Sequence, residues 1–152
     1  MPLPPRPDPS RRRTSAALAA AGITRATPDP AVAFAGLPLA ARAATPSALL
    51  DGYRQAAGAA PSPARGQQFF TQPHGREWSC SSCHGAVPTA TGRHASTGKP
   101  IAPLAPALNA ERFTEATRSE KWFRRNCNDV VGRECTAAEK ADVLAWLLTL
   151  QP

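Results

Sequence analysis

The sequence predicts an all-α protein with a single domain. Three observations support this class. Apolar residues recur at helical spacing in several segments, Ser/Thr-Pro pairs and a capping box stand where those segments begin, and no segment alternates as a strand would. The length of 152 residues suits one domain. No run of about 18 apolar residues occurs, which excludes a protein with several membrane spans.

Residues 1–43 differ in composition from the rest of the chain. The formal charge is +7, and these residues carry +4 of it through six Arg and two acidic residues. Ala-rich apolar stretches follow the Arg-bearing start, and Ala41-Arg42-Ala43 has small residues at the A-x-A positions of a cleavage site. This layout predicts a signal peptide over residues 1–43 that is removed before Ala44. A disordered tail on a cytoplasmic protein is the alternative interpretation.

The remaining chain, residues 44–152, is predicted to form the domain. It has no Lys/Arg stripe with interleaved aromatic residues, so we expect no nucleic-acid partner. About 109 residues bury only a thin core, and a bound cofactor would add to it.

Two helices are predicted at the start of this domain. Thr45-Pro46 and Ser62-Pro63 each place an N-cap before a proline at the first helical position. Apolar residues follow both starts at helical spacing: Leu49, Leu50, Tyr53 and Ala57, then Phe69 and Phe70. Gly58 is suited to end the first helix. Residues 71–77 are polar and contain Pro73 and Gly75, which predicts a loop.

The second half of the domain alternates irregular and helical segments. Residues 86–109 contain six Pro or Gly, so no long helix or central strand is expected, and a loop of this length is predicted to wrap around something. Residues 118–126 are predicted to be a helix with Trp122 and Phe123. Thr136 and Glu139 form a capping box that opens a last helix with apolar residues at Val143, Leu144, Trp146, Leu147 and Leu150.

The motif Cys80-Ser81-Ser82-Cys83-His84 is the C-x-x-C-H attachment signature of c-type haem. Two cysteines three positions apart lie on one face of a helical turn, so both sulfur atoms can reach the two vinyl groups along one haem edge. The next residue is rotated by about 100°, which directs the His84 imidazole toward the iron. We therefore expect one covalent haem c, with Cys80 and Cys83 as attachment residues and His84 as the proximal ligand.

Two other interpretations of this motif are weaker. A zinc site would need a second cysteine pair, but Cys127 and Cys135 have seven residues between them, a poor zinc spacing. A thioredoxin-like redox pair would need a βαβ pattern, which is absent from the sequence. Gly66, three residues before Phe69, would let its helix pack closely against the last helix; a tolerated helix glycine is the alternative interpretation.

Cys127 and Cys135 remain after the haem motif. In an exported protein an even leftover pair predicts a disulfide, with two buried free thiols as the alternative. This bond would tie Asn126 and the segment 128–134 to the start of the last helix.

The second axial ligand is not a methionine, because the only Met is residue 1 of the predicted leader. His74, His94, Lys99, an Asn or no residue remain. His74 is expected to face solvent. His94 lies in the wrapping segment, as a bis-His partner or as a surface or propionate-contacting histidine. Lys99 would need to lose its proton, so a solvent or propionate contact is the simpler interpretation.

Several stretches resemble the sphaeroides haem protein family, small high-spin cytochromes c of bacterial periplasms with a class I-like fold. The matching segments are 97–106, 112–114, 120–128, 132–136 and 139–142, and the resemblance covers essentially all of residues 44–150. In that family an asparagine side chain is the distal ligand, at the position of Asn126, and the cysteines matching Cys127 and Cys135 are paired. Taken alone, Asn126 is more simply interpreted as a helix C-cap.

The resemblance implies a periplasmic protein that accepts electrons from a dihaem cytochrome c or a membrane cytochrome b. When reduced it would release Asn126 and bind O2, NO or CO, since a neutral, hard amide oxygen suits ferric better than ferrous iron. Two alternatives stay open. One is a plain electron carrier with bis-His ligation through His94. The other is a weak oxidoreductase acting on O2, NO or peroxide, which is disfavoured because no distal acid or base is evident.

Overall fold

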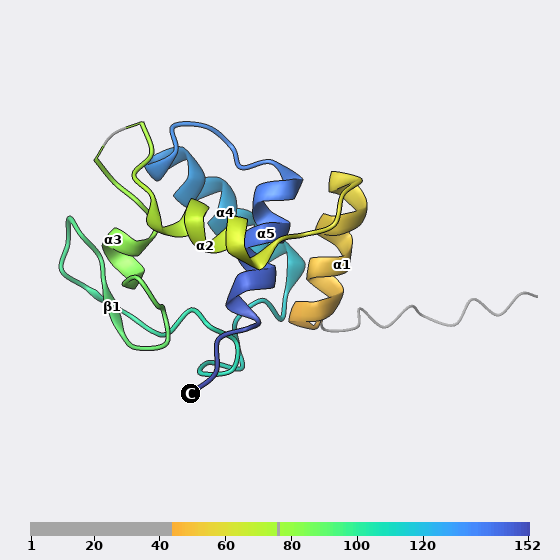
Figure 1. Ribbon diagram of the computed structural model, residues 1–152. Helices are drawn as coiled ribbons and strands as arrows, with labels where there is room; N and C mark the ends of the chain where they lie inside the picture. Colours follow the sequence, from red (N-terminus) through yellow and green to blue (C-terminus); the bar gives the residue numbers. More distant parts are fainter. Residues whose placement is uncertain (1–43, 76) are drawn as a thin grey trace, which may run out of the picture. The chain divides into compact units, whose positions relative to one another are not determined.

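The computed structural model describes residues 44–75 and 77–152, so the predicted signal peptide lies outside the described residues. Its elements are listed in chain order: α1 (Pro46–Ala57), α2 (Pro63–Thr71), α3 (Ser81–His84), β1 (Gly92–Arg93), β2 (Pro100–Ile101), α4 (Ala116–Val130) and α5 (Ala137–Leu147). This order confirms the all-α class (Figure 1). No helix among these residues is long and apolar enough to cross a membrane.

Three helices begin where the sequence predicts. The hydroxyl of Thr45 accepts a hydrogen bond from the Ala48 N–H at 3.1 Å, and that of Ser62 accepts from the Arg65 N–H at 3.3 Å. The predicted capping box before α5 is complete, because Thr136 and Glu139 each bond the other's backbone N–H. Gly58 ends α1 with φ of 63°, a left-handed conformation that favours glycine.

Helix α4 is longer than predicted at both ends. Glu115 caps its start by accepting from the Arg118 N–H at 3.2 Å, a role for which Glu is a weak sequence signal. The helix continues past Asn126 to its cap at Val131, just before Gly132 with φ of 79°. The interpretation of Asn126 as a C-cap is therefore wrong, since no breaking residue follows it until Gly132.

The segment 86–109 is irregular apart from one small hairpin. Strands β1 and β2 pair antiparallel, with Gly92 opposite Ile101 and Arg93 opposite Pro100. The absence of a long helix or central strand agrees with the expectation from the sequence, but the short hairpin was not predicted. Two residues per strand are too few to show alternation, and Pro100 lacks the N–H that a longer ladder would need.

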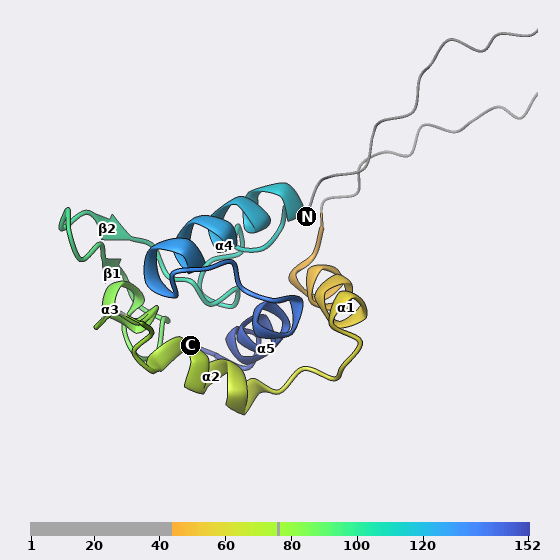
Figure 2. The same ribbon diagram turned by 90° about the horizontal axis from the view of Figure 1, so that it is seen from above.

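Helix α5 forms the centre of the core and packs against both α1 and α2 (Figure 2). Ala141 and Leu144 face Leu49 and Tyr53 of α1. On the other side, Val143, Trp146 and Leu147 surround Phe70 of α2.

The crossing of α2 and α5 needs Gly66. A Cβ atom at this position would overlap the backbone carbonyl of Asp142, so only glycine permits this approach. This confirms the close packing proposed for Gly66. Asp142 is itself buried and accepts from Arg65 at 2.7 and 2.9 Å and from the Ser62 N–H at 2.5 Å. The start of α2 is thus fixed to α5.

Candidate cofactor site

The C-x-x-C-H segment folds into the single turn of α3. Cys80 stands at its N-cap position, and the His84 N–H bonds the Cys80 carbonyl at 3.1 Å. Ser79 is buried before the turn, and its N–H bonds the Ser82 hydroxyl at 3.0 Å. Gly85, with φ of 78°, ends the turn. The two cysteines and the histidine are therefore held on a short, defined piece of backbone.

Cys80 and Cys83 are both free thiols and both half-buried. Burial raises the pKa of the Cys80 thiol to about 11. A redox-active C-x-x-C pair needs a lowered thiol pKa, so the thioredoxin-like interpretation finds no support in this environment. Two free thiols on one helical turn instead suit permanent attachment to a cofactor.

His84 is half-buried beside the apolar core. Its ring centroid lies 6.1 Å from that of Phe70, which in turn lies 5.0 Å from that of Trp146. Burial, and secondarily the positive charge of Arg112, lower the pKa of His84 to about 4. Within the described residues neither ring nitrogen of His84 makes a hydrogen bond. A neutral imidazole with a free nitrogen is what iron ligation requires.

The β1–β2 hairpin lies directly against α3. A Cβ atom at Gly92 would overlap the carbonyl oxygen of Cys83, and the Ala95 N–H donates to the Cys83 sulfur at 3.3 Å. His94 belongs to this hairpin. Its Nδ1 accepts from the Thr97 N–H at 3.3 Å and lies 3.2 Å from the Ser96 hydroxyl. His94 thus shares the side of the molecule that carries the attachment turn, and Lys99 is exposed in the same hairpin.

His74 is half-buried, and the expectation that it faces solvent is wrong. Its Nε2–H donates to the carbonyl of Phe69 at 2.7 Å, and the two ring centroids are 4.4 Å apart. The bond satisfies a carbonyl at the end of α2 that has no partner within the helix. His74 is therefore part of the helix terminus.

Asn126 lies inside α4, three residues after Phe123 and one before Cys127. Phe123 contacts both core clusters and Cys127 is buried, whereas Asn126 is exposed. Residues three apart share a helix face, so Asn126 stands at the border of the inward side. Its amide makes no hydrogen bond within the described residues. Asn has a low helix propensity in a helix interior, and no local hydrogen bond accounts for an asparagine at position 126.

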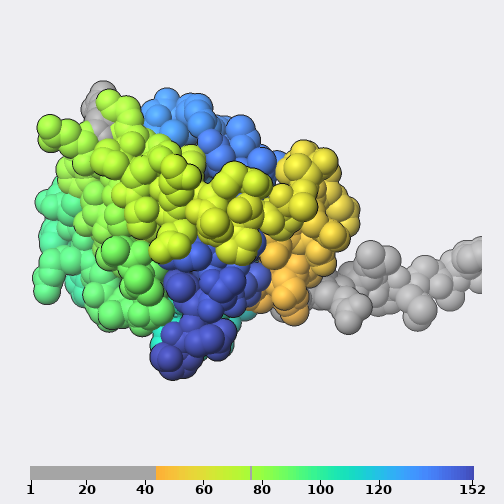
Figure 3. Space-filling model, in the orientation of Figure 1, coloured from red at the N-terminus to blue at the C-terminus, as the bar shows by residue number. Residues whose placement is uncertain are grey.

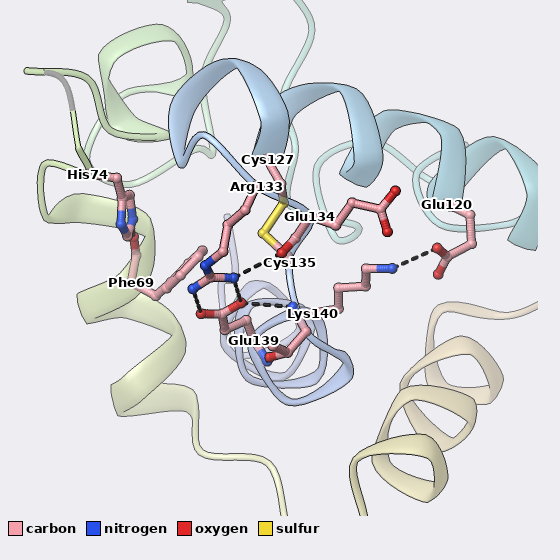
Figure 4. The surroundings of a disulfide bond; sticks show 10 residues. Phe69, His74, Glu120, Cys127, Arg133, Glu134, Cys135, Glu139 and Lys140 are labelled. Carbon is pink, nitrogen blue, oxygen red and sulfur yellow. Dashed lines mark hydrogen bonds and ion pairs between the residues drawn. A yellow bond between two sulfur atoms is a disulfide. The ribbon is translucent and has the colours of Figure 1, made fainter. Parts of the chain in front are cut away.

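The end of α4 is tied to the start of α5 by a disulfide. The sulfur atoms of Cys127 and Cys135 are 1.97 Å apart and both residues are buried (Figure 4). These two thiols are therefore not available to join Cys80 and Cys83 around a zinc ion. A second link joins the same helices, because Lys140 donates to Glu120 at 2.7 Å.

Comparisons with known proteins found matches over most of the described domain. A family profile described as a domain of unknown function (DUF1924) matches residues 56–147. The chain is 51% identical over 107 residues to the cytochrome c-type protein SHP of Cereibacter sphaeroides, covering 68% of this chain and 82% of the relative. It is 44% identical over 94 residues to cytochrome c'' of Methylophilus methylotrophus, covering 59% and 65%.

The chain belongs to the SHP family.

Solved structures support the same conclusion. The structure of oxidised SHP, described as an oxygen-binding cytochrome c, matches with a TM-score of 0.65 and 47% identity, covering 70% of this chain and 97% of that one. Oxidised cytochrome c'' of Methylophilus methylotrophus matches with a TM-score of 0.64 and 38% identity, covering 70% and 95%. A solution structure of that cytochrome c'' concerns haem-ligand detachment. Like its relatives, this member of the SHP family carries covalently bound haem c and has a helical cytochrome c fold.

The residues described above fit the haem of the SHP family. Two free thiols and a neutral, unbonded imidazole lie together on α3, next to aromatic side chains of α2 and α5. Helix α4 does not pack against another described helix as closely as α1 and α2 pack against α5. A planar apolar group held by α3 would add to a core that is thin without it.

Segment 112–114 contributed to the family resemblance, but the sequence assigned no role to Arg112 or Phe113. Arg112 donates to the carbonyls of Pro103 at 2.9 Å and Ala102 at 2.7 Å, which holds the wrapping segment together. Phe113 has φ of 58°, a strained conformation for an aromatic residue, and its ring centroid lies 6.2 Å from that of Phe123. One feature of the sequence could have drawn attention to Arg112, which is the only basic residue between Lys99 and Arg118.

Proposed function

We propose that this protein is a periplasmic haem protein that accepts electrons from a partner cytochrome and, when reduced, releases Asn126 and binds a diatomic gas. Cys80 and Cys83 hold the haem, and His84 is the proximal ligand. Bound haem supplies a redox-active iron with one further coordination position. A dihaem cytochrome c or a membrane cytochrome b is the electron donor, and O2, NO and CO are the candidate gases.

The observation that carries the proposal is the position of Asn126. Its amide has no hydrogen-bond partner within the described residues and stands at the inward border of α4. An amide oxygen is a neutral, hard ligand, so it favours ferric over ferrous iron. Reduction then weakens the bond. The adjacent Cys127 keeps the backbone in place through its disulfide while the Asn126 side chain turns away.

The relatives support both the binding of a diatomic gas and the release of a haem ligand. SHP of Cereibacter sphaeroides is described as oxygen-binding, and cytochrome c'' of Methylophilus methylotrophus is described in terms of haem-ligand detachment. Asn126 is favoured over His94 because the Nδ1 of His94 is engaged within its own hairpin, which packs on α3. For that reason we assign no bis-His carrier function.

Asn126→Ala tests the ligand, with Asn128→Ala as the control, since Asn128 is an exposed asparagine on the same helix. We expect the ferric absorption and electron paramagnetic resonance spectra to change in Asn126→Ala and to stay as in wild type in Asn128→Ala. All three reduced proteins should bind CO. An unchanged ferric spectrum in Asn126→Ala rejects this ligand, and a reduced wild-type spectrum insensitive to CO rejects gas binding. Steady-state turnover of O2, NO or peroxide that is lost in His94→Ala would instead establish an oxidoreductase.

A further inference from the structure

The described part of the chain includes two exposed tryptophans. Trp122 of α4 is 48% exposed and Trp78, just before the attachment turn, is 41% exposed, whereas Trp146 in the core is only 4% exposed. Tryptophan is a large apolar side chain that is well buried on average, so an exposed one marks a place where a ligand or a partner can cover it. The position of Trp122 on α4 indicates which group covers it.

Trp122 is next to the proposed distal ligand. It stands four residues before Asn126, so the two side chains are neighbours on one flank of α4. Figures 1 and 2 both place the C-terminal end of α4 at the end of the molecule that carries α3. In Figure 3 the lighter blue segment in which α4 ends reaches the surface at the upper edge of the visible face. The C-terminal end of α4, towards which Asn126 lies, is thus at the same end of the molecule as the attachment turn.

Arg125 holds the ring of Trp122 in place. Its guanidinium carbon lies 5.7 Å from the centroid of the indole, which is within the range of a cation–π contact. Asp129, one turn further along α4, lies 3.9 Å from the Arg125 Nε. This ion pair is too exposed to add much stability, so its effect is on the position of the two side chains. The cation occupies one face of the indole, and no described side chain buries the ring.

We propose that Trp122 packs on the distal side of the bound haem, beside Asn126, and limits the size of the ligands that reach the iron. The indole excludes water and bulky molecules, so a diatomic gas enters when the Asn126 side chain turns away. This rests on the gas binding proposed above and adds the residue that determines ligand specificity. Arg125 is a positioning residue, because it acts through the Trp122 ring.

Hydroxyl-radical oxidation of the ferric holoprotein, measured by mass spectrometry, tests the contact without any added ligand. By their exposure among the described residues, Trp122 and Trp78 would be oxidised at similar rates. Packing on the haem should instead slow the oxidation of Trp122 by about fivefold relative to Trp78, towards the rate of the buried Trp146. Equal rates for Trp122 and Trp78 would overturn the proposal.

Two neutral ligands of different size test the specificity. The association rates of CO and of n-butyl isocyanide with the reduced protein are measured by stopped flow. In Trp122→Ala we expect the isocyanide rate to rise by about tenfold and the CO rate by less than about threefold, because the space that the indole leaves matters mainly to the larger ligand. Trp122→Phe keeps an aromatic ring, so both rates should stay within about twofold of wild type. An equal rise of both rates in Trp122→Ala would indicate a loosened fold and would overturn the proposal.

Trp78→Ala is the matched control, because it removes the same side chain from another exposed position. The ratio of its two rates should equal that of wild type, and a shift as large as in Trp122→Ala would contradict the proposal. Arg125→Gln should raise the isocyanide rate by about threefold, whereas the exposed neighbour Arg124→Gln should leave it unchanged.

The ferric spectra of these variants should match wild type, since Asn126 is retained in all of them. That result separates the role of Trp122 from the role of the distal ligand. If CO fails to bind the reduced wild-type protein, gas binding fails, and the packing of Trp122 on the haem is judged by the oxidation rates alone.

Discussion

Helices α2 and α4 are attached to α5 in opposite ways. Helix α2 crosses α5 at backbone contact through Gly66, and Phe70 and the buried Asp142 complete the joint. Helix α4 is joined to the region of α5 by side chains: the Cys127–Cys135 disulfide, the Lys140–Glu120 ion pair and the contacts of Phe123.

The two joints differ in the kind of contact that makes them, backbone against backbone for α2 and side chains for α4. Phe70 of α2 packs against His84, so the close joint of α2 with α5 supports the turn that carries His84. Helix α4, with the proposed ligand Asn126, is tethered at the disulfide. Under the proposed function, the first arrangement would suit a permanent attachment and the second a ligand that leaves the iron. Three changes test this contrast.

The largest effect is expected at the joint of α2 and α5. Gly66→Ala forces a methyl group into the Asp142 carbonyl, so the helices must separate, and we expect a loss of about 3 kcal/mol in the free energy of unfolding. Urea unfolding of the holoprotein, followed by circular dichroism, measures it. Gly52→Ala in α1 is the control, since a Cβ there meets nothing within 4 Å, and it should stabilise by about 0.5–1 kcal/mol. Equal stability of the two variants would contradict the close joint.

The next effect is expected at the disulfide. The double variant Cys127→Ser/Cys135→Ser frees a loop with a sequence separation of 8, which should cost about 2.5 kcal/mol through the entropy of the unfolded chain. The effect should be local. Amide hydrogen exchange should accelerate in α4 and stay slow in α2 and α5. Uniform acceleration in all three helices would show that α4 is as firmly integrated as α2.

The smallest effect is expected at the Lys140–Glu120 pair. Although burial acts in the opposite direction, the hydrogen bond from Lys140 lowers the pKa of Glu120 below its ordinary 4.5. A lowered folded-state pKa stabilises the protein above the unfolded value, and this contribution is lost as the pH falls through the folded value. Glu120 is nearly half exposed, so a double-mutant cycle with Lys140→Met and Glu120→Gln should give only about 0.5 kcal/mol at pH 7.

The pH dependence supplies the check on this pair. The coupling energy should fall toward zero as the pH is lowered through the folded-state pKa of Glu120, because a protonated carboxyl no longer forms an ion pair with Lys140. Coupling that persists after Glu120 is protonated would mean that the two side chains interact through packing. That result would mean that α4 packs against α5 more closely than a single ion pair requires.

Local signals in the sequence predicted much of this fold. Thr45, Ser62 and Thr136 act within one helical turn, so the starts of three helices could be predicted, and Gly58 ends α1 by its own conformation. The extent of α4 could not be predicted, because Glu115 is a weak cap and nothing after Asn126 marks a stop before Gly132. The hairpin was missed since two-residue strands have no period.

The candidate site also has one part that the local sequence predicts and another part that only tertiary contacts create. The spacing of Cys80, Cys83 and His84 specifies one turn, so the attachment of haem follows from five consecutive residues. The burial that lowers the pKa of His84 comes from contacts that span the chain, in which Phe70 and Arg112 take part. No local pattern reveals such contacts.

The sequence by itself determined the all-α class, the haem attachment motif and the absence of a methionine ligand from residues 44–152, while the leader over residues 1–43 stays a prediction. Each of these depends on residues within a few positions of one another or on composition. Only the tertiary structure decided that His74 closes α2, that His94 and Lys99 lie on a hairpin against Cys83, and that Asn126 stands inside a helix tied by side chains. Apart from the His74–Phe69 bond, which joins residues five apart, those facts depend on which separate segments meet, and packing against α5 and α3 decides that.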